Sequence, residues 1–404
     1  MRRISKISRQ ILAQNSGRDP DRLKLKLALI RHDPFAFFRG TNPLFLSSLS
    51  RMHFLFRAPS TYVCGDLHLE NFGAYKGDNR LCYFDINDFD EACLAPFTID
   101  IVRFMAGVDL AARELGFSRA QGRKFVKRFR VEYVRSIGSG KPRWIERSLA
   151  QGVFRDLLRR AMRRSRRALL NRYTKTKNGS RRLRIDGKRV LAIGALDKER
   201  LREFSNRLRV PSTDRRFFRF IDAGRRVAGN GSLGLERFVL LVRGRGSPDQ
   251  NFVLDLKFAA PSAVVHWLRR SQPGWQDEAV RVTRIQRTMQ AIAPALLHAV
   301  VYRGQHFILK ELQPSIDRLD TAQWRKKPRR FEQAVAGMGR VAAWAHLRSC
   351  GHDGTASVED LQAYVSGKRW ARAAERLSAS SADDIRHAWR TYAKDYDAGA
   401  LAAT

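Results

Sequence analysis

The stretch Cys64-Gly65-Asp66-Leu67-His68-Leu69-Glu70-Asn71-Phe72-Gly73 decides how the rest of the chain is interpreted. It places an aspartate five positions before an asparagine, in a segment with little helix or strand character of its own. An apolar run then leads into a second acidic cluster, Phe84-Asp85-Ile86-Asn87-Asp88-Phe89-Asp90-Glu91. A carboxylate that orients a hydroxyl, with an amide and a second carboxylate that bind a divalent cation, are the groups that phosphoryl transfer requires.

These residue types suit the chemistry for a physical reason. The transferred phosphoryl group carries much negative charge and needs little covalent help, so catalysis consists mostly of positioning and of Mg²⁺. Mg²⁺ takes oxygen ligands, usually one or two carboxylates together with phosphate oxygens and water. We therefore expect Asp66 to orient the acceptor hydroxyl or take its proton, and Asn71 and Asp88 to bind the metal ion.

Two other aspartates and one histidine belong to the same candidate site. Asp85 and Asp90 are the alternatives to Asp88 as metal ligands, because the alignment of their cluster can shift along the chain. His68 is a candidate catalytic residue, although a histidine in such a loop is more often only hydrogen-bonded within the fold. Glycine, aspartate and asparagine together are typical of a turn. The presence of both acidic segments is what favours chemistry over a simple turn.

A second pattern that fits this chemistry is Gly229-Asn230-Gly231-Ser232-Leu233-Gly234, which has the spacing G-x-G-x-x-G. In a dinucleotide-binding fold such a turn must open a helix. Here the apolar segments 238–242 and 251–257 follow, which predicts strand, turn and strand. Glycines in a hairpin let backbone N–H groups approach the phosphates of ATP, as in protein kinases, whereas the alternative is an ordinary hairpin with a flexible turn. The residues expected to contact the nucleotide are Gly229, Gly231, Ser232 and Gly234.

Lys257 stands at the inner end of the second of these strands. It would neutralise charge on the α- and β-phosphates; the alternative is a lysine on an edge strand. Residues 277–292 predict a helix beside it, and the kinase arrangement requires a carboxylate on that helix. Glu278 is the candidate partner of Lys257, although it lies near the start of the helix.

Other segments predict the elements that carry these residues. Residues 61–63 predict a strand before the acidic loop, the name used here for residues 64–71. Residues 71–75 and 81–86 predict a hairpin. A helix is expected after Pro96, with Asp100 near its start. Capping that helix is the simpler role for Asp100, and support of the acidic loop is the other. The aromatic segment 32–40 predicts a loop packed into the core.

Composition limits the class of protein. The 404 residues, 44% of them hydrophobic, predict a globular chain of two or three domains or lobes. A membrane span requires about eighteen consecutive apolar residues, and no such run exists; the N-terminus lacks the apolar segment of a secretory signal. The four scattered cysteines form no C-x-x-C pair, which fits a reducing cytoplasm.

The formal net charge of +38 favours encounters with polyphosphates and other polyanions. The densest basic run lies at residues 159–167 and keeps an apolar side. A solvated helix face is the simpler interpretation, and contact with an acidic substrate, nucleic acid or anionic lipid is the alternative. Few aromatic residues interrupt the run, which argues against a stacking surface for single strands.

Three blocks of the sequence together resemble the bacterial domain-of-unknown-function family 2252: residues 33–40, residues 65–73, and residues 84–91 with Asp100. The likeness extends over roughly residues 30 to 350. Two of the blocks also look like the G-D-x-H-x-x-N and I-D-F-D-D-A motifs of aminoglycoside and homoserine kinase relatives. Cys64 stands where those kinases usually carry histidine. The resemblance implies a protein-kinase-like fold and leaves the substrate open.

The order of the motifs differs from that of ordinary kinases, because the acidic loop comes before the Gly-rich segment. We therefore predict an α+β, two-lobed, protein-kinase-like fold that is circularly permuted. Residues 1–175 would form the catalytic loop and helices of the larger lobe, 176–315 the nucleotide-binding β lobe, and 316–404 the remaining helices. The leading hypothesis is an ATP- and Mg²⁺-dependent phosphotransferase with an unknown hydroxyl acceptor. The alternatives are an inactive nucleotide-binding pseudokinase or scaffold, and a basic nucleic-acid-binding protein.

Overall fold

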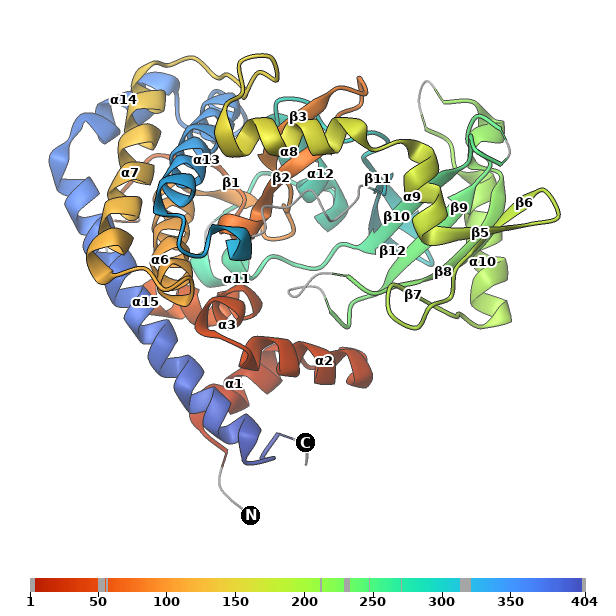
Figure 1. Cartoon of the computed structure of the whole chain (residues 1–404), viewed down its shortest axis with the longest axis horizontal. Helices are drawn as coiled ribbons and strands as arrows, with labels where there is room; N and C mark the ends of the chain where they lie inside the picture. Colours follow the sequence, from red (N-terminus) through yellow and green to blue (C-terminus); the bar gives the residue numbers. More distant parts are fainter. Residues whose placement is uncertain are drawn as a thin grey trace.

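The computed structural model describes residues 4–49, 55, 57–210, 213–228, 233–246, 248–269, 271–312 and 321–401. The fold is α+β, as predicted: a helical part and a six-stranded antiparallel sheet lie side by side (Figure 1). Most of the hydrophobic core lies in the helical part, and the residues of the sheet contribute two smaller clusters.

The six-stranded sheet has the strand order β11-β12-β10-β9-β8-β7. The predicted strands before and after the turn at residues 243–251 are confirmed as β9 and β10, which pair antiparallel with Lys257 opposite Arg237. Helix α12 follows β10 and precedes the hairpin of β11 and β12. The strands are β7 (Val190–Leu191), β8 (Phe220–Arg226), β9 (Arg237–Val242), β10 (Phe252–Phe258), β11 (His298–Tyr302) and β12 (Gln305–Glu311).

The helical part is built from both ends of the described chain. Helix α13 packs against α7, and α15 packs against α6 and α1. Side chains also join the two ends directly, because Ser8 Oγ donates to Asp395 at 2.7 Å. The helices of the two ends are α1 (Lys6–Gln14), α2 (Pro20–Arg31), α3 (Pro34–Gly40), α4 (Asn42–Leu49), α6 (Thr98–Glu114), α7 (Arg119–Gly138), α13 (Pro328–Ser349), α14 (Val358–Ser366) and α15 (Lys368–Asp397).

The remaining helices connect or flank the two parts. Helix α8 runs from the helical part toward the sheet and is followed by α9 and a small hairpin (Figure 1). Its apolar residues are buried except for Met162, whereas its arginines are largely exposed. These elements are α8 (Gly152–Arg163), α9 (Arg166–Tyr173), β5 (Thr174–Lys177), β6 (Ser180–Leu183), α10 (Ala195–Arg207), α11 (Ala263–Leu268) and α12 (Glu278–Met289).

Two small antiparallel pairs carry the acidic segments. Strand β1 (Ser60–Val63) pairs with β4 (Cys93–Pro96), and β2 (Phe72–Lys76) pairs with β3 (Cys82–Ile86). The predicted hairpin is therefore confirmed, with Phe72 opposite Ile86. This register brings Asn71, just before β2, close to the chain that leaves β3: the backbone N–H of Asn87 donates to the carbonyl of Asn71 at 2.7 Å.

Two expectations about local structure were wrong. Residues 34–40 form helix α3 and not a loop, because Asp33 caps it and Pro34 occupies its first turn. Its phenylalanines Phe35, Phe37 and Phe38 are buried, as expected of a core segment. Asp100 does not cap α6, which begins without a side-chain cap. Among the described helices, none combines the length and the apolar character needed to cross a membrane.

Candidate functional site

A cleft of about 830 Å³ lies where the acidic loop, the N-terminal helices and the segment after β10 meet. Its walls include Asp66, His68, Asn71 and Asp88, four of the residues expected to form the site. Asp90 and Glu91 line it too. The two acidic segments therefore share one cavity, and the β2–β3 hairpin brings them together.

The acidic loop is held by Asp100 of α6. The Asp100 carboxylate accepts hydrogen bonds from the backbone N–H groups of Cys64 at 2.8 Å and Gly65 at 2.9 Å. His346 of α13 lies 3.4 Å from the same carboxylate. Asp100 and His346 are fully buried, so these contacts anchor the acidic loop to the protein interior. Asp100 therefore supports the acidic loop, the second of the two roles expected for it.

Asp66 forms a partly buried ion pair with the fully buried Arg103 of α6. Arg103 Nε donates to Asp66 Oδ1 at 2.6 Å, and Nη2 contacts the same oxygen. Both contacts of Arg103 are to Oδ1. Burial raises the pKa of Asp66 to about 7, the Arg103 charge opposes this rise, and the nearby Glu91 and Asp88 add to it. A carboxylate with such a pKa can both accept and release a proton near neutrality.

Asn71 and Asp88 both line the cleft and can provide oxygen atoms there. Asn71 Nδ2 donates to the backbone carbonyl of Asp66, which leaves Oδ1 as its ligand atom. The described residues include no group of three or more His, Cys, Asp or Glu side chains arranged to hold a metal ion. Mg²⁺ in phosphoryl-transfer sites usually takes only one or two protein carboxylates, the remaining ligands being phosphate oxygens and water. One amide oxygen and one carboxylate fit that pattern.

Asp85 is occupied by other contacts. Its carboxylate accepts from the backbone N–H of Ala291 at 2.9 Å and lies 3.1 Å from Arg348 Nη2. It is buried and is not among the residues that line the cleft. Of the aspartates considered as metal ligands, Asp88 and Asp90 line the cavity and Asp85 holds neighbouring elements together.

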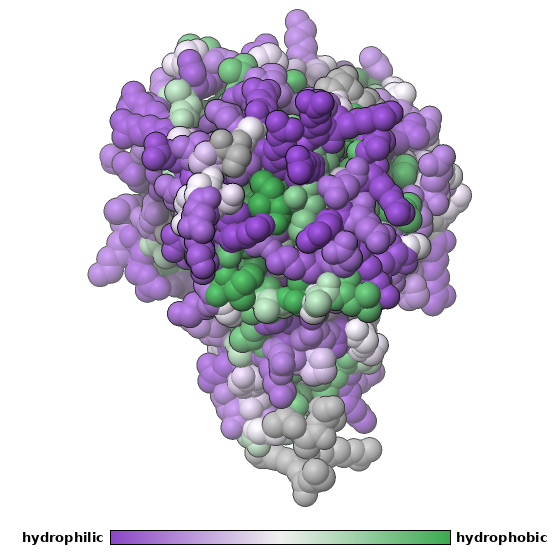
Figure 2. All heavy atoms as spheres, turned by 90° about the vertical axis from the view of Figure 1, so that its right-hand side faces the viewer, coloured by the Kyte–Doolittle hydropathy of each residue, from purple (hydrophilic) through white to green (hydrophobic). Residues whose placement is uncertain are grey.

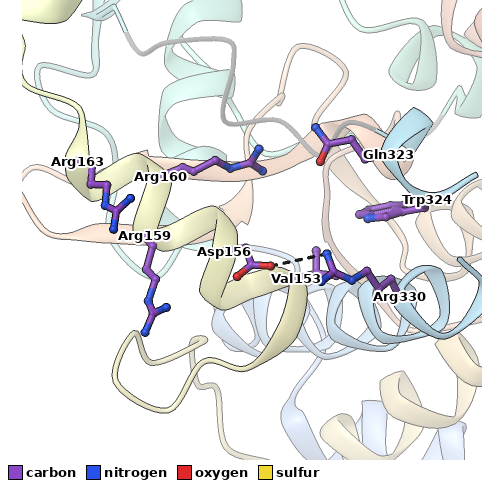
Figure 3. A pocket seen from close by; sticks show the side chains of 8 residues that line it. All are labelled: Val153, Asp156, Arg159, Arg160, Arg163, Gln323, Trp324 and Arg330. Atoms are coloured by element: carbon purple, nitrogen blue, oxygen red, sulfur yellow. Dashed lines mark ion pairs between the residues drawn. The ribbon is translucent and has the colours of Figure 1, made fainter.

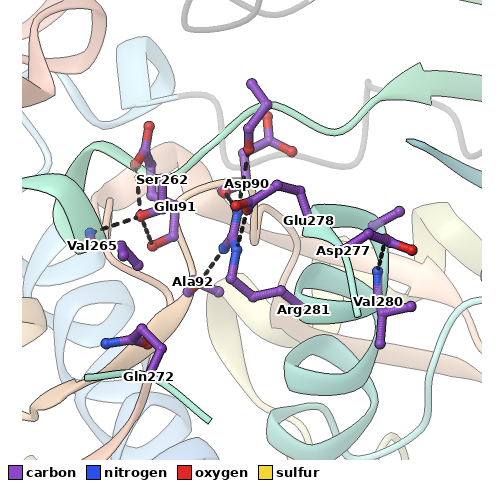
Figure 4. Close-up of polar contacts among 12 residues, drawn as sticks. Asp90, Glu91, Ala92, Ser262, Val265, Gln272, Asp277, Glu278, Val280 and Arg281 are labelled. Carbon is purple, nitrogen blue, oxygen red and sulfur yellow. Dashed lines mark hydrogen bonds and ion pairs between the residues drawn. The ribbon is translucent and has the colours of Figure 1, made fainter. Parts of the chain in front are cut away.

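Lys257 of β10 pairs with Asp90 and not with Glu278. Glu278, at the start of α12, instead contacts Arg281 one turn later. The buried Arg281 guanidinium also donates to the backbone carbonyls of Asp90, at 3.0 Å, and Ala92 (Figure 4). The expected pairing of Lys257 with Glu278 is therefore wrong. Arg281 of α12 pairs with the Glu278 carboxylate and also contacts the acidic turn, which comprises residues 88–91.

Glu91 links the acidic turn to α11. Its carboxylate accepts from the backbone N–H of Ala263 at 2.6 Å and from Ser262 Oγ at 3.2 Å (Figure 4). Burial raises the pKa of Glu91, and the hydrogen bond from Ala263 opposes that rise. Together with the Lys257–Asp90 pair, this contact joins the acidic turn to the chain that leaves β10.

The other candidate residues are placed as follows. His68 is buried in the cleft wall, and its Nδ1 accepts from the backbone N–H of Glu70 at 3.2 Å. Gly229, Gly231 and Ser232 lie outside the described residues. Gly234 is described and has a φ of +91°, in the left-handed region that favours glycine.

Sequence reasoning missed the basic residues of the cleft. Arg18, Lys26 and Arg39 line it from the N-terminal helices. No motif singles them out, since basic residues occur throughout this chain. Arg103 could have been found, because it follows Asp100 by three positions and therefore lies on the same side of α6.

A second, smaller cavity of about 380 Å³ lies between α8 and the start of α13. Arg160 points toward Gln323, and Arg330 pairs with Asp156 at 3.8 Å (Figure 3). Arg159 and Arg163 point away from Gln323 (Figure 3). The basic run expected to be a solvated helix face therefore also borders a cavity.

The surface of the sheet side carries few apolar groups. Seen from the right-hand side of Figure 1, the molecule is mostly hydrophilic, with an apolar area near the centre of that face and a band of apolar residues below it (Figure 2). Small exposed apolar areas are normal for a protein surface.

Residues 18–397 match the family described as "Uncharacterized protein conserved in bacteria (DUF2252)", and the chain belongs to this family. The match includes the acidic loop, the acidic turn, the sheet and the helices of both ends except α1. Comparison with curated proteins found no match. Comparison with solved structures found none either.

Proposed function

We propose that this member of the family is an ATP- and Mg²⁺-dependent phosphotransferase with a circularly permuted, protein-kinase-like fold. One observation carries the proposal. A single cleft is lined by Asp66, Asn71 and Asp88, and Lys257 from the sheet pairs with the acidic turn beside them. Kinases require a base, a metal-binding amide and carboxylate, and a strand lysine for the phosphates.

The order of elements in the sheet supports the same proposal. A strand, a Gly-containing segment, a second strand, a third strand bearing Lys257, the two helices α11 and α12, and two more strands follow one another. The glycine-rich loop and strand lysine of protein kinases occur in this order. The helical part is assembled from residues on both sides of the sheet, which is the connectivity that a permutation would produce.

The residues suggest how transfer would proceed. The acceptor hydroxyl would donate to Asp66 Oδ2 while Arg103 fixes Oδ1. Its oxygen would bond to the γ-phosphorus as the bond to the β,γ-bridging oxygen breaks, the proton passing to Asp66 and ADP leaving. Asn71 and Asp88 would hold Mg²⁺, which when bound neutralises charge on the phosphates. Lys257 would turn from Asp90 toward the α- and β-phosphates.

The test is nucleotide binding and turnover by the whole chain. We expect Mg·ATP to raise the unfolding temperature and the protein to release ADP. Asp66→Asn should lower ADP release by at least about a hundredfold while nucleotide affinity stays within a few-fold, since general base catalysis contributes about 10²–10⁴. Binding without turnover would favour a pseudokinase, and equal turnover in the variant would exclude Asp66 as the base.

A second candidate function is nucleic-acid binding, favoured by the basic face of α8. Arg159, Arg160 and Arg163 are exposed and form no ion pair with any part of the chain that the structure describes. Replacing all three by alanine should weaken binding to a duplex RNA and reduce the slope of log affinity against log salt by up to about two to three. No binding by the parent chain at about 0.15 M salt would exclude this function.

A further inference from the structure

The smaller cavity, between α8 and the start of α13, is separate from the cleft. Among the described residues, none lines both cavities. The two helices pack closely, because a Cβ added at Gly337 of α13 would clash with the Phe154 ring of α8. The cavity measures about 380 Å³, which is the size of a small-molecule site and too small to enclose a nucleic-acid duplex. A ligand enclosed here would therefore be a small molecule.

Arginines from both helices line this cavity. Arg160 of α8 points toward Gln323, and Arg330 belongs to the first turn of α13 (Figure 3). Both arginines are exposed, and Arg160 forms no ion pair within the part of the chain that the structure describes. Arg330 lies 3.8 Å from Asp156, which is too far for a hydrogen bond. N–H donors of both guanidinium groups are therefore open to a ligand.

The interior of the cavity also has an apolar part. Val153 and Trp324 line it and are only 6% and 4% exposed. Trp324 lies between Gln323 and Arg330 in Figure 3, and its ring packs edge-on against Phe331 with 5.7 Å between the ring centroids. A buried indole ring beside an aliphatic side chain suits the apolar body of an organic molecule, whereas the arginines suit charged groups on that body.

The charge around the cavity is strongly positive. The segment between Trp324 and Arg330 carries four exposed basic residues: Arg325, Lys326, Lys327 and Arg329. Among the described residues that line the cavity, Asp156 alone is acidic. The planar guanidinium group binds phosphate through two parallel N–H bonds. Two such groups, one from each helix, match a ligand with more than one phosphate charge better than a carboxylate with a single charge.

We propose that this cavity binds a small organic molecule that carries at least two phosphate charges. Arg160 and Arg330 would bind the phosphate groups, and Trp324 would contact the apolar body of the ligand. The site is independent of the proposed function, because it uses no residue of the cleft. It also differs from a nucleic-acid surface, because only the side chains that reach the cavity would determine the affinity.

Calorimetric titration of the whole chain with inorganic pyrophosphate tests the site. Mg²⁺ is left out, so that the acidic residues of the cleft repel the probe. Arg160→Gln should weaken binding at least about tenfold, because a hydrogen bond between two charged groups is lost. Arg159→Gln is the matched control. Arg159 is equally charged and exposed but points away from Gln323 (Figure 3), so its replacement should change the affinity less than about threefold.

Asp156→Asn provides a second test with the opposite sign. The variant removes the carboxylate that repels an anion in the cavity and that lies near Arg330. Binding of pyrophosphate should therefore become about two- to fivefold tighter. The Asp156 side chain is 44% exposed, so the substitution leaves the hydrophobic core intact.

The outcomes decide between this cavity, a general basic surface and the cleft. Weaker binding in Arg160→Gln, with little change in Arg159→Gln and tighter binding in Asp156→Asn, would support the proposal. Equal losses in the two arginine variants would indicate a general basic surface, as nucleic-acid binding predicts, and would overturn it. No binding by the parent chain would overturn it as well. A loss of affinity in Lys257→Met as large as in Arg160→Gln would place the pyrophosphate in the cleft, with the same consequence.

Discussion

The Asp100 carboxylate accepts a hydrogen bond from the backbone N–H of Gly65 at 2.9 Å, one position before Asp66. The same carboxylate binds the N–H of Cys64 and lies beside His346, so residues from three distant parts of the chain meet at one buried anion. The candidate base is thus positioned by a group that itself does not line the cleft.

Asp100→Ala should destabilise the protein by about 2–5 kcal/mol, because two buried N–H groups lose a charged acceptor. Chemical denaturation measures the change. Asp384→Ala is the control, since Asp384 is exposed on α15 and should shift the free energy of unfolding by less than about 0.5 kcal/mol. Equal stability of the two variants would contradict the support assigned to Asp100.

Gly65→Ala should reduce both stability and turnover. Gly65 has a φ of +75°, and an added Cβ would lie 2.3 Å from the Glu91 carbonyl oxygen. The acidic loop and the acidic turn are thus too close at this point for a larger residue. We expect the free energy of unfolding to fall by more than the roughly 1–3 kcal/mol that backbone strain alone would cost. Gly116→Ala shares the positive φ without any atom within 4 Å, so it should show the backbone strain alone. A loss no larger at Gly65 than at Gly116 would refute the close approach.

The pH dependence of kcat/KM for ATP should report Asp66. Burial raises its pKa to about 7, and a general base must be deprotonated to act. The rate constant should therefore rise about tenfold per pH unit below 7 and level off above about 8. Steady-state kinetics between pH 5.5 and 9 measures it, and a flat profile would argue against Asp66 as the base.

The sheet should lose stability in acid through Asp255. Burial alone would raise the pKa of this carboxylate, but Arg226 at 2.6 Å and Arg237 outweigh it and hold the pKa well below its usual value. A depressed folded-state pKa gives stability that is full above the unfolded value of about 4 and is lost as pH falls below it.

Asp255→Asn should then cost about 3–5 kcal/mol at pH 7, because it leaves two buried guanidinium groups unpaired. The difference in unfolding free energy between variant and parent should shrink between pH 4 and the lowest pH at which both stay folded. A constant difference over that range would show that the Asp255 charge does not act through these arginines.

Patterns local in sequence predicted much of the fold. The hairpin of β2 and β3, strands β9 and β10, and helices α6 and α12 follow from apolar spacing, turn residues and helix starts. Helix α3 was missed because its seven residues include three phenylalanines and a single charged side chain, so no polar face marks a helical period. Its start signals, Asp33 and Pro34, were nevertheless present.

Contacts between distant segments could not be read in the same way. The sequence identified Asp66, Asn71 and Asp88, which line one cleft, because they lie in two short blocks. It gave the wrong partner for Lys257, since the competition of Arg281 for Glu278 depends on how α12 packs against the acidic turn. The basic residues of the cleft were missed because no local pattern in the sequence marks Lys26 as buried.

The joining of α1 and α15 through Ser8 and Asp395 has a consequence for biosynthesis. A ribosome makes the chain from its N-terminus, so the acidic loop emerges long before α13 and α15, which complete the helical core around it. The sheet, whose strands lie between Val190 and Glu311, can pair while those helices are still being synthesised. We expect the newly made N-terminal helices to expose apolar surface until α13 and α15 have been synthesised, and to be bound by chaperones during that time.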